Sequence, residues 1–151
     1  KQANVTFYYG DVRTACRIIG DVIDIALNSE NELDGKLKIA LKPKRSLDDA
    51  HIHPEYIDFI NQTKSQYENF SILNRDTKIH TLIHPKTVFI SRPYTSIAKL
   101  AALHGSKSLF YDPTQDLVNI PLFMTGVEFA SGVEDLGSKL ITTFLDFRGQ
   151  S

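Results

Sequence analysis

Several residue types are scarce in this chain of 151 residues, which has no tryptophan and only one cysteine and one methionine. The single Cys16 excludes an internal disulfide and fits a reducing compartment. No apolar run approaches the ~20 residues that a membrane-spanning helix needs. The first residues, KQANVTFYYG, do not resemble a signal peptide. These absences together favour a cytoplasmic protein.

Net charge is also close to zero. Seventeen Lys and Arg residues nearly balance 18 Asp and Glu residues, which leaves a formal charge of −1. A nucleic-acid-binding domain usually carries a basic excess, so nucleic acid is not an expected partner. The hydrophobic content of 42% and the length suit one ordinary domain spanning residues 1–151.

Strand-like and helix-like patterns alternate along the chain. Residues 4–9 (NVTFYY) are typical of a strand, and residues 12–27 have the apolar spacing of an amphipathic helix. Further strands are expected at 37–41, 70–73, 87–91, 108–111 and 127–130, and further helices at 54–67, 77–83, 96–103 and 133–144. Such alternation predicts an α/β, Rossmann-like fold, with a parallel sheet and helices on both faces.

The connecting segments carry weaker signals. Residues 28–35 (NSENELDG) are predicted to form a polar turn, and residues 148–151 a frayed tail. Ser131 and Glu134 have the spacing of a capping box for the last helix. Gly105 is placed to end the helix before it.

Ligands of open parallel sheets bind beyond the carboxyl ends of the strands, near the point where the strand order reverses. That rule selects the loops at residues 9–12, 42–45, 91–96 and 111–115. The first helix lacks the GxGxxG and GxxxxGK[ST] patterns. An ordinary dinucleotide dehydrogenase and a P-loop nucleotidase are therefore disfavoured.

The loop SRPYTS, residues 91–96, is the best candidate site. It leads from Ser91 into a helix whose free N–H groups and dipole favour phosphate. Thr95 and Ser96 would add hydroxyl donors, and Arg92 a forked cation. The alternative is that Thr95 or Ser96 only caps the helix while Arg92 lies in solvent.

A second candidate is the basic segment after the strand at 37–41, where Lys42, Lys44 and Arg45 would hold a phosphate or a sugar carboxylate. A solvated basic turn is the alternative. Asp112 directly follows a strand and would reach a sugar hydroxyl, and Asp11 would face the cleft. A turn and an N-cap explain these two carboxylates equally well.

A metal site is not expected. The spacing of the five histidines matches no familiar ligand motif, and no cysteine pair supports one. They are His51, His53, His80, His84 and His104.

The order of these motifs resembles the C-terminal, donor-binding half of bacterial glycosyltransferases with the GT-B architecture, most of all those of capsule and lipopolysaccharide assembly. Four segments carry the resemblance: LKIALKPKR, VFISRPYTS, IAKLAALHGSKSLFYDPT and GVEFASGVEDLGSKL. Together they cover nearly the whole chain. Each motif is moderately specific, and their order and spacing add to the match.

The resemblance implies two Rossmann-like domains facing each other across a cleft, of which this chain supplies one. By analogy Thr95 and Ser96 bind the donor's phosphate, and Lys42 and Lys44 face its charged part. The donor is a CMP- or UDP-linked sugar, with no further cofactor. Some relatives that use CMP-activated acidic sugars have His-Pro after the basic strand. Here Lys44-Arg45 stands there, which weighs against CMP.

The catalytic base and the acceptor site would lie on an N-terminal domain or a partner chain, and the full-length protein would associate peripherally with the inner membrane. Two alternatives stay open. One is a non-catalytic binding or regulatory module of flavodoxin-like shape, with the strip IPLFM at 120–124 as a partner surface. The other is one half of a sugar-nucleotide epimerase.

Overall fold

A computed structural model of the chain describes residues 2–6, 12–33, 35, 37–42, 54–74, 76–91, 96–115 and 126–149. Its centre is a six-stranded sheet in which each neighbouring pair of strands is parallel. The strands are β1 Gln2–Thr6, β2 Lys38–Lys42, β3 Phe70–Ile72, β4 Thr87–Ser91, β5 Lys107–Asp112 and β6 Val127–Ser131. The predicted α/β, Rossmann-like class is confirmed.

The strand order is β3-β2-β1-β4-β5-β6. This is the order of dinucleotide-binding sheets, and it differs from the 2-1-3-4-5 order of flavodoxin-like sheets. The chain moves outward from β1 through β2 to β3, and then returns to the centre to add β4, β5 and β6 on the other side. The order therefore reverses between β1 and β4.

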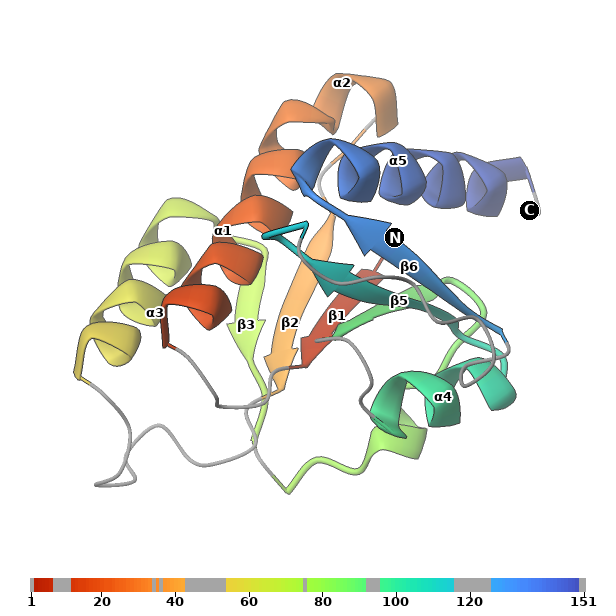
Figure 1. Ribbon diagram of the computed structural model, residues 1–151, viewed down its shortest axis with the longest axis horizontal. Helices are drawn as coiled ribbons and strands as arrows, with labels where there is room; N and C mark the ends of the chain where they lie inside the picture. Colours follow the sequence, from red (N-terminus) through yellow and green to blue (C-terminus); the bar gives the residue numbers. More distant parts are fainter. Residues whose placement is uncertain are drawn as a thin grey trace.

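Helices cover both faces of this sheet. They are α1 Val12–Asn28, α2 Glu30–Leu33, α3 Pro54–Gln66, α4 Ser96–Leu103 and α5 Val133–Gly149, with the 3₁₀ helix η1 Ile79–Thr81. Figure 1 shows α1, α3 and α5 on one side of the sheet and α4 on the other. The main core lies under α1 and α5, where Ile18 and Leu140 pack against strand residues such as Ile90. All five residues of β4 are buried, as expected for a central parallel strand.

Most predicted elements are confirmed, and β4 and α4 have the expected bounds. Strand β1 ends at Thr6, whereas the prediction extended over residues 7–9, which lie outside the described part. The prediction of a polar turn over residues 28–35 was wrong, because this segment contains α2. Leu33 of that helix is 1% exposed, so core packing stabilises a short helix in a segment that looks polar in sequence.

The helix predicted over 77–83 is only the three-residue η1, and the last helix is longer than predicted. No residue of η1 is buried, so no packing extends it beyond one turn. In contrast, α5 continues to Gly149 because Phe147 packs edge-to-face on Phe144, with ring centroids 5.5 Å apart. The frayed tail expected from residue 148 was therefore wrong for Arg148 and Gly149.

The capping box predicted at the start of α5 was wrong, because the N-cap is a glycine, which has no side chain to accept from the helix. Leu136 N donates to Gly132 O at 3.1 Å, so Gly132 and not Ser131 is the N-cap. The carboxylate that accepts from Ser131 N, at 2.9 Å, belongs to Asp135 and not to Glu134. Gly132 adopts a φ of 82°, in the region that favours glycine.

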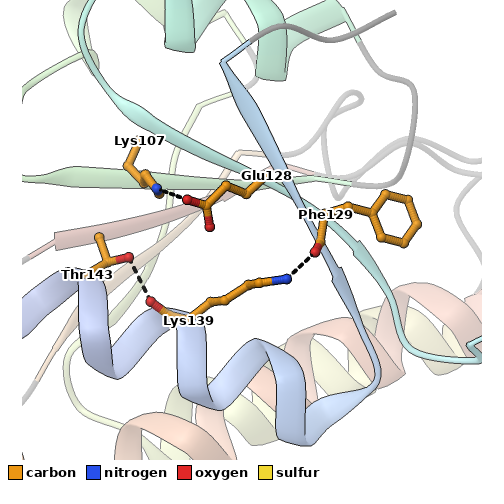
Figure 2. A network of polar contacts seen from close by, with 5 residues as sticks. All are labelled: Lys107, Glu128, Phe129, Lys139 and Thr143. Carbon is orange, nitrogen blue, oxygen red and sulfur yellow. Dashed lines mark hydrogen bonds and ion pairs between the residues drawn. The ribbon is translucent and has the colours of Figure 1, made fainter. Parts of the chain in front are cut away.

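The edge strand β6 is tied to α5 and β5 (Figure 2). The Lys139 ammonium donates to the Phe129 carbonyl and to Asp135 Oδ2, the latter at 3.0 Å. Lys107 forms an ion pair with Glu128 across the β5–β6 pair. Burial raises the pKa of Asp135, but its bonds with Ser131 N and Lys139 outweigh this and hold the pKa below its usual value. These contacts protect a strand edge that would otherwise be open to pairing.

Two serines at the start of β5 differ in how their hydroxyls are satisfied. The Ser106 hydroxyl donates to His84 O and accepts from His84 N, both at 2.8 Å. The Ser108 hydroxyl is fully buried and has no hydrogen-bond partner among the described residues. An unsatisfied buried polar group destabilises a fold by roughly 1–3 kcal/mol.

We therefore expect Ser108→Ala to raise the free energy of unfolding by about 1 kcal/mol. The matched change Ser106→Ala should lower it by about 1–2 kcal/mol, because it leaves the His84 N–H and carbonyl without their partner. Urea unfolding of both variants measures the contrast. Similar losses in the two variants would show that the Ser108 hydroxyl is bonded after all.

Candidate functional site

The carboxyl ends of the central strands form the edge at which an open parallel sheet binds its ligands. Thr6, the last residue of β1, pairs with Lys42, the last residue of β2. On the other side Val5 pairs with Ile90, so β1 and β4 also end together. The ends of β2, β1 and β4 are thus aligned at the point where the strand order reverses.

Four of the predicted site residues lie on this edge within the described part. Lys42 ends β2 and is half-buried, and Ser96 begins α4 and is exposed. Ser91 ends β4 at 2% exposure, and Asp112 ends β5 at 4%. A ligand at the edge would meet Lys42 and Ser96 first. The remaining predicted residues lie outside the described part: Asp11, Lys44, Arg45, Arg92 and Thr95.

Side-chain alternation brings three of these residues to the same face. Successive residues of a strand point to opposite faces of the sheet. The residue before each of Lys42, Ser91 and Asp112 belongs to the core beneath α1 and α5; these are Leu41, Ile90 and Tyr111. Lys42, Ser91 and Asp112 therefore point to the α4 side. A cation, a hydroxyl and a carboxylate share one face of one edge.

The two helices that begin at the reversal point are the ones whose first turns carry no acid. Helices α1 and α4 follow β1 and β4, and neither has Asp or Glu in its first turn. Helices α2, α3 and α5 each carry at least one: Glu30 and Glu32, Glu55, and Glu134 and Asp135. An acid would neutralise the positive end of the helix dipole. Asp11 directly precedes α1, so among the described helices α4 suits an anion best.

Asp112 is held by Thr114, a contact that sequence reasoning missed. Its Oδ1 accepts from Thr114 N at 3.1 Å and from Thr114 Oγ1 at 2.7 Å. The interpretation of residues 112–114 as a turn is thus confirmed, and a sugar contact for Asp112 stays a prediction. The Asp-Pro-Thr pattern was the available signal, because Asp and Thr commonly bond their own backbone in turns.

Gln115, next along the chain, also went unrecognised. Its φ of 63° lies in the left-handed region, which is uncommon for a residue other than glycine. Its side chain lies against Gly132, at the start of α5, so closely that a Cβ built there would be 2.2 Å from Nε2. No local pattern predicts this contact, because the two residues lie on segments that only the sheet brings together.

Tyr111 connects the carboxyl end of β5 to α1 on the core side of the sheet. Its hydroxyl donates to Asp21 Oδ2 of α1 at 2.6 Å, and the side chain is fully buried. Burial, followed by the bond with Asp21, raises the pKa of the phenol far above its usual value. The bond joins α1 to β5, which are 90 residues apart in sequence.

The described residues were also compared for clusters of possible metal ligands. No three His, Cys, Asp or Glu residues there lie close enough together to hold an ion, and His51 and His53 lie outside it. Among the same residues no helix is long and apolar enough to span a bilayer.

Comparison with known protein families gives one finding. Residues 2–140 match the model of a family described as polysaccharide biosynthesis PFTS motif proteins. No curated protein matches the chain significantly. The family match extends from β1 into α5 and so includes the whole sheet and the edge described above. The chain belongs to the polysaccharide biosynthesis PFTS motif protein family.

Proposed function

We propose that the chain is the nucleotide-sugar-binding half of a glycosyltransferase that acts in polysaccharide biosynthesis. The family match supports the process. The observation that carries the binding role is the place of residues 91–96 in the chain. They connect the end of β4 to the start of α4, at the reversal of strand order where such sheets bind nucleotides.

The name of the family also points to residues 91–96 as the phosphate site. Taken as one-letter codes, PFTS matches Pro93-Tyr94-Thr95-Ser96, with Tyr in place of Phe. Both hydroxyl residues of the predicted phosphate site fall within these four positions. A motif that names a family and precedes an acid-free helix N-terminus is consistent with a phosphate loop.

The proposed reaction transfers a glycosyl group from a nucleotide to an acceptor hydroxyl. As the bond from the anomeric carbon to the phosphate oxygen breaks, negative charge develops on the phosphate. Donors already aimed at that charge would lower the barrier. In our proposal they are the N–H groups at the start of α4, the hydroxyls of Thr95 and Ser96, and the cations Arg92 and Lys42.

Asp112 would accept a hydrogen bond from a ribose or sugar hydroxyl, since Thr114 holds its carboxylate at the same edge. Lys44, Arg45 and Asp11 keep the roles expected from sequence. The acceptor and the catalytic base would come from a second domain or a partner chain. We therefore expect the 151-residue chain to bind donor weakly and to turn over little of it by itself.

Nucleotide binding tests this proposal. We expect CMP or UDP to raise the melting temperature and to give a calorimetric isotherm. Thr95→Ala/Ser96→Ala should weaken that binding at least about tenfold, because hydrogen bonds to a charged group contribute about 1.5–3 kcal/mol each. Lys42→Ala should weaken it less. The matched controls Lys64→Ala and Ser65→Ala, on α3, should leave it unchanged.

Two results would contradict the proposal. One is nucleotide binding that the Thr95→Ala/Ser96→Ala variant retains in full, since the ligand would then lie elsewhere. The other is the absence of binding by CMP, UDP and GDP when the chain is tested together with its second domain or partner.

A further inference from the structure

Acidic residues are distributed very unevenly along this nearly neutral chain. All 18 lie outside residues 77–111, although that segment makes up 35 of the 151 residues. The same segment holds five basic residues and three of the five histidines. These are Lys78, Lys86, Arg92, Lys99 and Lys107, with His80, His84 and His104. The acid-free segment contains η1, β4 and α4, and most of β5.

The fold places η1 and α4 of this segment together, on the face of the sheet opposite α1, α3 and α5 (Figure 1). The helices on the other face carry exposed acids, among them Asp24, Glu55 and Asp146. The side of the sheet that bears α4 therefore receives Lys and His side chains but no acid from residues 77–111, whereas the helices on the other side carry exposed residues of both charges, such as Asp24 and Arg17.

The side of the sheet that bears α4 also exposes large apolar side chains. Helix α4 (SIAKLAAL) buries Ala98 and Ala101 completely against the sheet. Its outer side exposes Leu100 at 41% and Leu103 at 68%, the highest value of any large hydrophobic residue in the described part. A helix that is apolar on both sides is normally covered on both. Lys99 is the only charged residue of α4.

Hollows surround these leucines and mix apolar with basic side chains. One of about 450 Å³ is lined by His80, Ile83, Leu100 and His104. An adjoining one of about 300 Å³ shares Leu100 and is lined also by Ser96, Ile97, Lys99 and Leu103. The outer face of α4 thus presents protruding leucines next to Lys99 and two histidines. We call this surface the α4 face and define it by Ile83, Ile97, Lys99, Leu100 and Leu103.

We propose that the α4 face docks on the surface of an anionic lipid bilayer. Exposed leucines beside a lysine, here Lys99, with no acid from the same segment, are the combination by which helices lie in the membrane interface. The leucines would enter the acyl boundary, and the Lys99 ammonium would meet lipid phosphates. Charge complementarity favours a lipid surface over a protein partner for the α4 face, because the cores of protein interfaces are depleted in Lys.

Vesicle co-sedimentation tests the proposal. The purified chain is mixed with vesicles of phosphatidylcholine alone, or with about 30% phosphatidylglycerol, a content that gives the anionic surface on which basic residues act. We expect binding to the anionic vesicles at low salt, little binding to the neutral ones, and weaker binding as salt screens the charges. Nucleotide binding is measured separately, so a failure here leaves the proposed donor site unaffected.

Matched variants locate the contact. Leu100→Gln/Leu103→Gln should weaken vesicle binding by about tenfold or more, since two side chains no longer leave water. The control Leu27→Gln/Leu145→Gln changes leucines of 45% and 43% exposure on α1 and α5, and should have no effect. Lys99→Gln should weaken binding about fivefold. Lys64→Gln, on the opposite face, should not. Melting temperatures confirm that each variant is folded.

Three outcomes would overturn the proposal. The first is no binding to anionic vesicles at low salt, or equal binding to neutral ones. The second is an equal loss in the Leu27→Gln/Leu145→Gln control. The third is a self-associated chain that Leu100→Gln/Leu103→Gln converts to a monomer in sedimentation velocity, because the α4 face would then contact a second copy of the protein.

Discussion

Gly132→Ala should lower the free energy of unfolding by about 2–3 kcal/mol, an effect large for a change of one methyl group. Two causes add. A φ of 82° is unfavourable for any residue with a Cβ, and the new methyl would lie 2.2 Å from the amide nitrogen of Gln115. The Gln115 side chain would have to move away from the start of α5. Thermal unfolding should show a decrease of about 5–10 °C.

The two causes can be separated by a double-mutant cycle. In a Gln115→Ala background, Gly132→Ala should still lower stability by about 1–2 kcal/mol, because the backbone strain remains when the clash is gone. Gly137→Ala is the matched control. Gly137 lies inside α5, and a Cβ there would make ordinary contact, 3.6 Å from Ile25 Cγ1. That change should stabilise the protein by about 0.5–1 kcal/mol. A neutral Gly132→Ala would contradict the geometry at the start of α5.

Stability should fall steeply above pH 10, because two buried tyrosines resist ionisation in the folded state. Burial, with a smaller contribution from Glu30, raises the pKa of Tyr67 from 10.0 to about 12. The phenol also donates to Leu37 O at 2.6 Å, a bond that only its protonated form can make. Burial also raises the pKa of Tyr111. Below pH 10 both phenols are protonated in both states, so stability is unaffected. Above it only the unfolded chain releases their protons, and unfolding is favoured.

For Tyr67 the expected loss is about 1.4 kcal/mol per pH unit between pH 10 and 12, or about 2.7 kcal/mol in total. Tyr111 adds a loss of the same sign. Urea unfolding at pH 8, 10 and 11 measures the slope. Tyr67→Phe and Tyr111→Phe should each make the decline shallower. Unchanged stability of the unmodified chain from pH 8 to 11 would show that these phenols ionise freely.

Tyr111→Phe has a second consequence at neutral pH. It leaves Asp21 without the hydroxyl that the structure places 2.6 Å away, between α1 and β5. The sequence marks Tyr111 only as the end of a strand. Its role depends on α1 lying over β5, and nothing in the local pattern of either segment carries that information.

The same dependence on tertiary contacts explains which helices and strands could be predicted from the sequence. The strand at 87–91 and the helix at 96–103 were predicted with the correct bounds, because local apolar runs and a stop at Gly105 mark them. Helix α2 was missed because one buried leucine, Leu33, stabilises it. The segment at 77–83 was overestimated because its apolar residues look helical, but none of the residues of η1 is buried. Tertiary contacts decided both cases.

By itself, the sequence determined the alternation of strands and helices, the α/β class, and the loops that follow each strand, because these depend on residues close together in the chain. It also contained the PYTS segment and the acid-free stretch at 77–111. The tertiary structure alone decided the strand order, and with it the meeting of Lys42, Ser91 and Asp112 on one face of the carboxyl edge. It also decided that Gln115 touches Gly132, and that the acid-free stretch forms one outer surface around α4. Each of these depends on long-range strand pairing, which a local pattern does not encode.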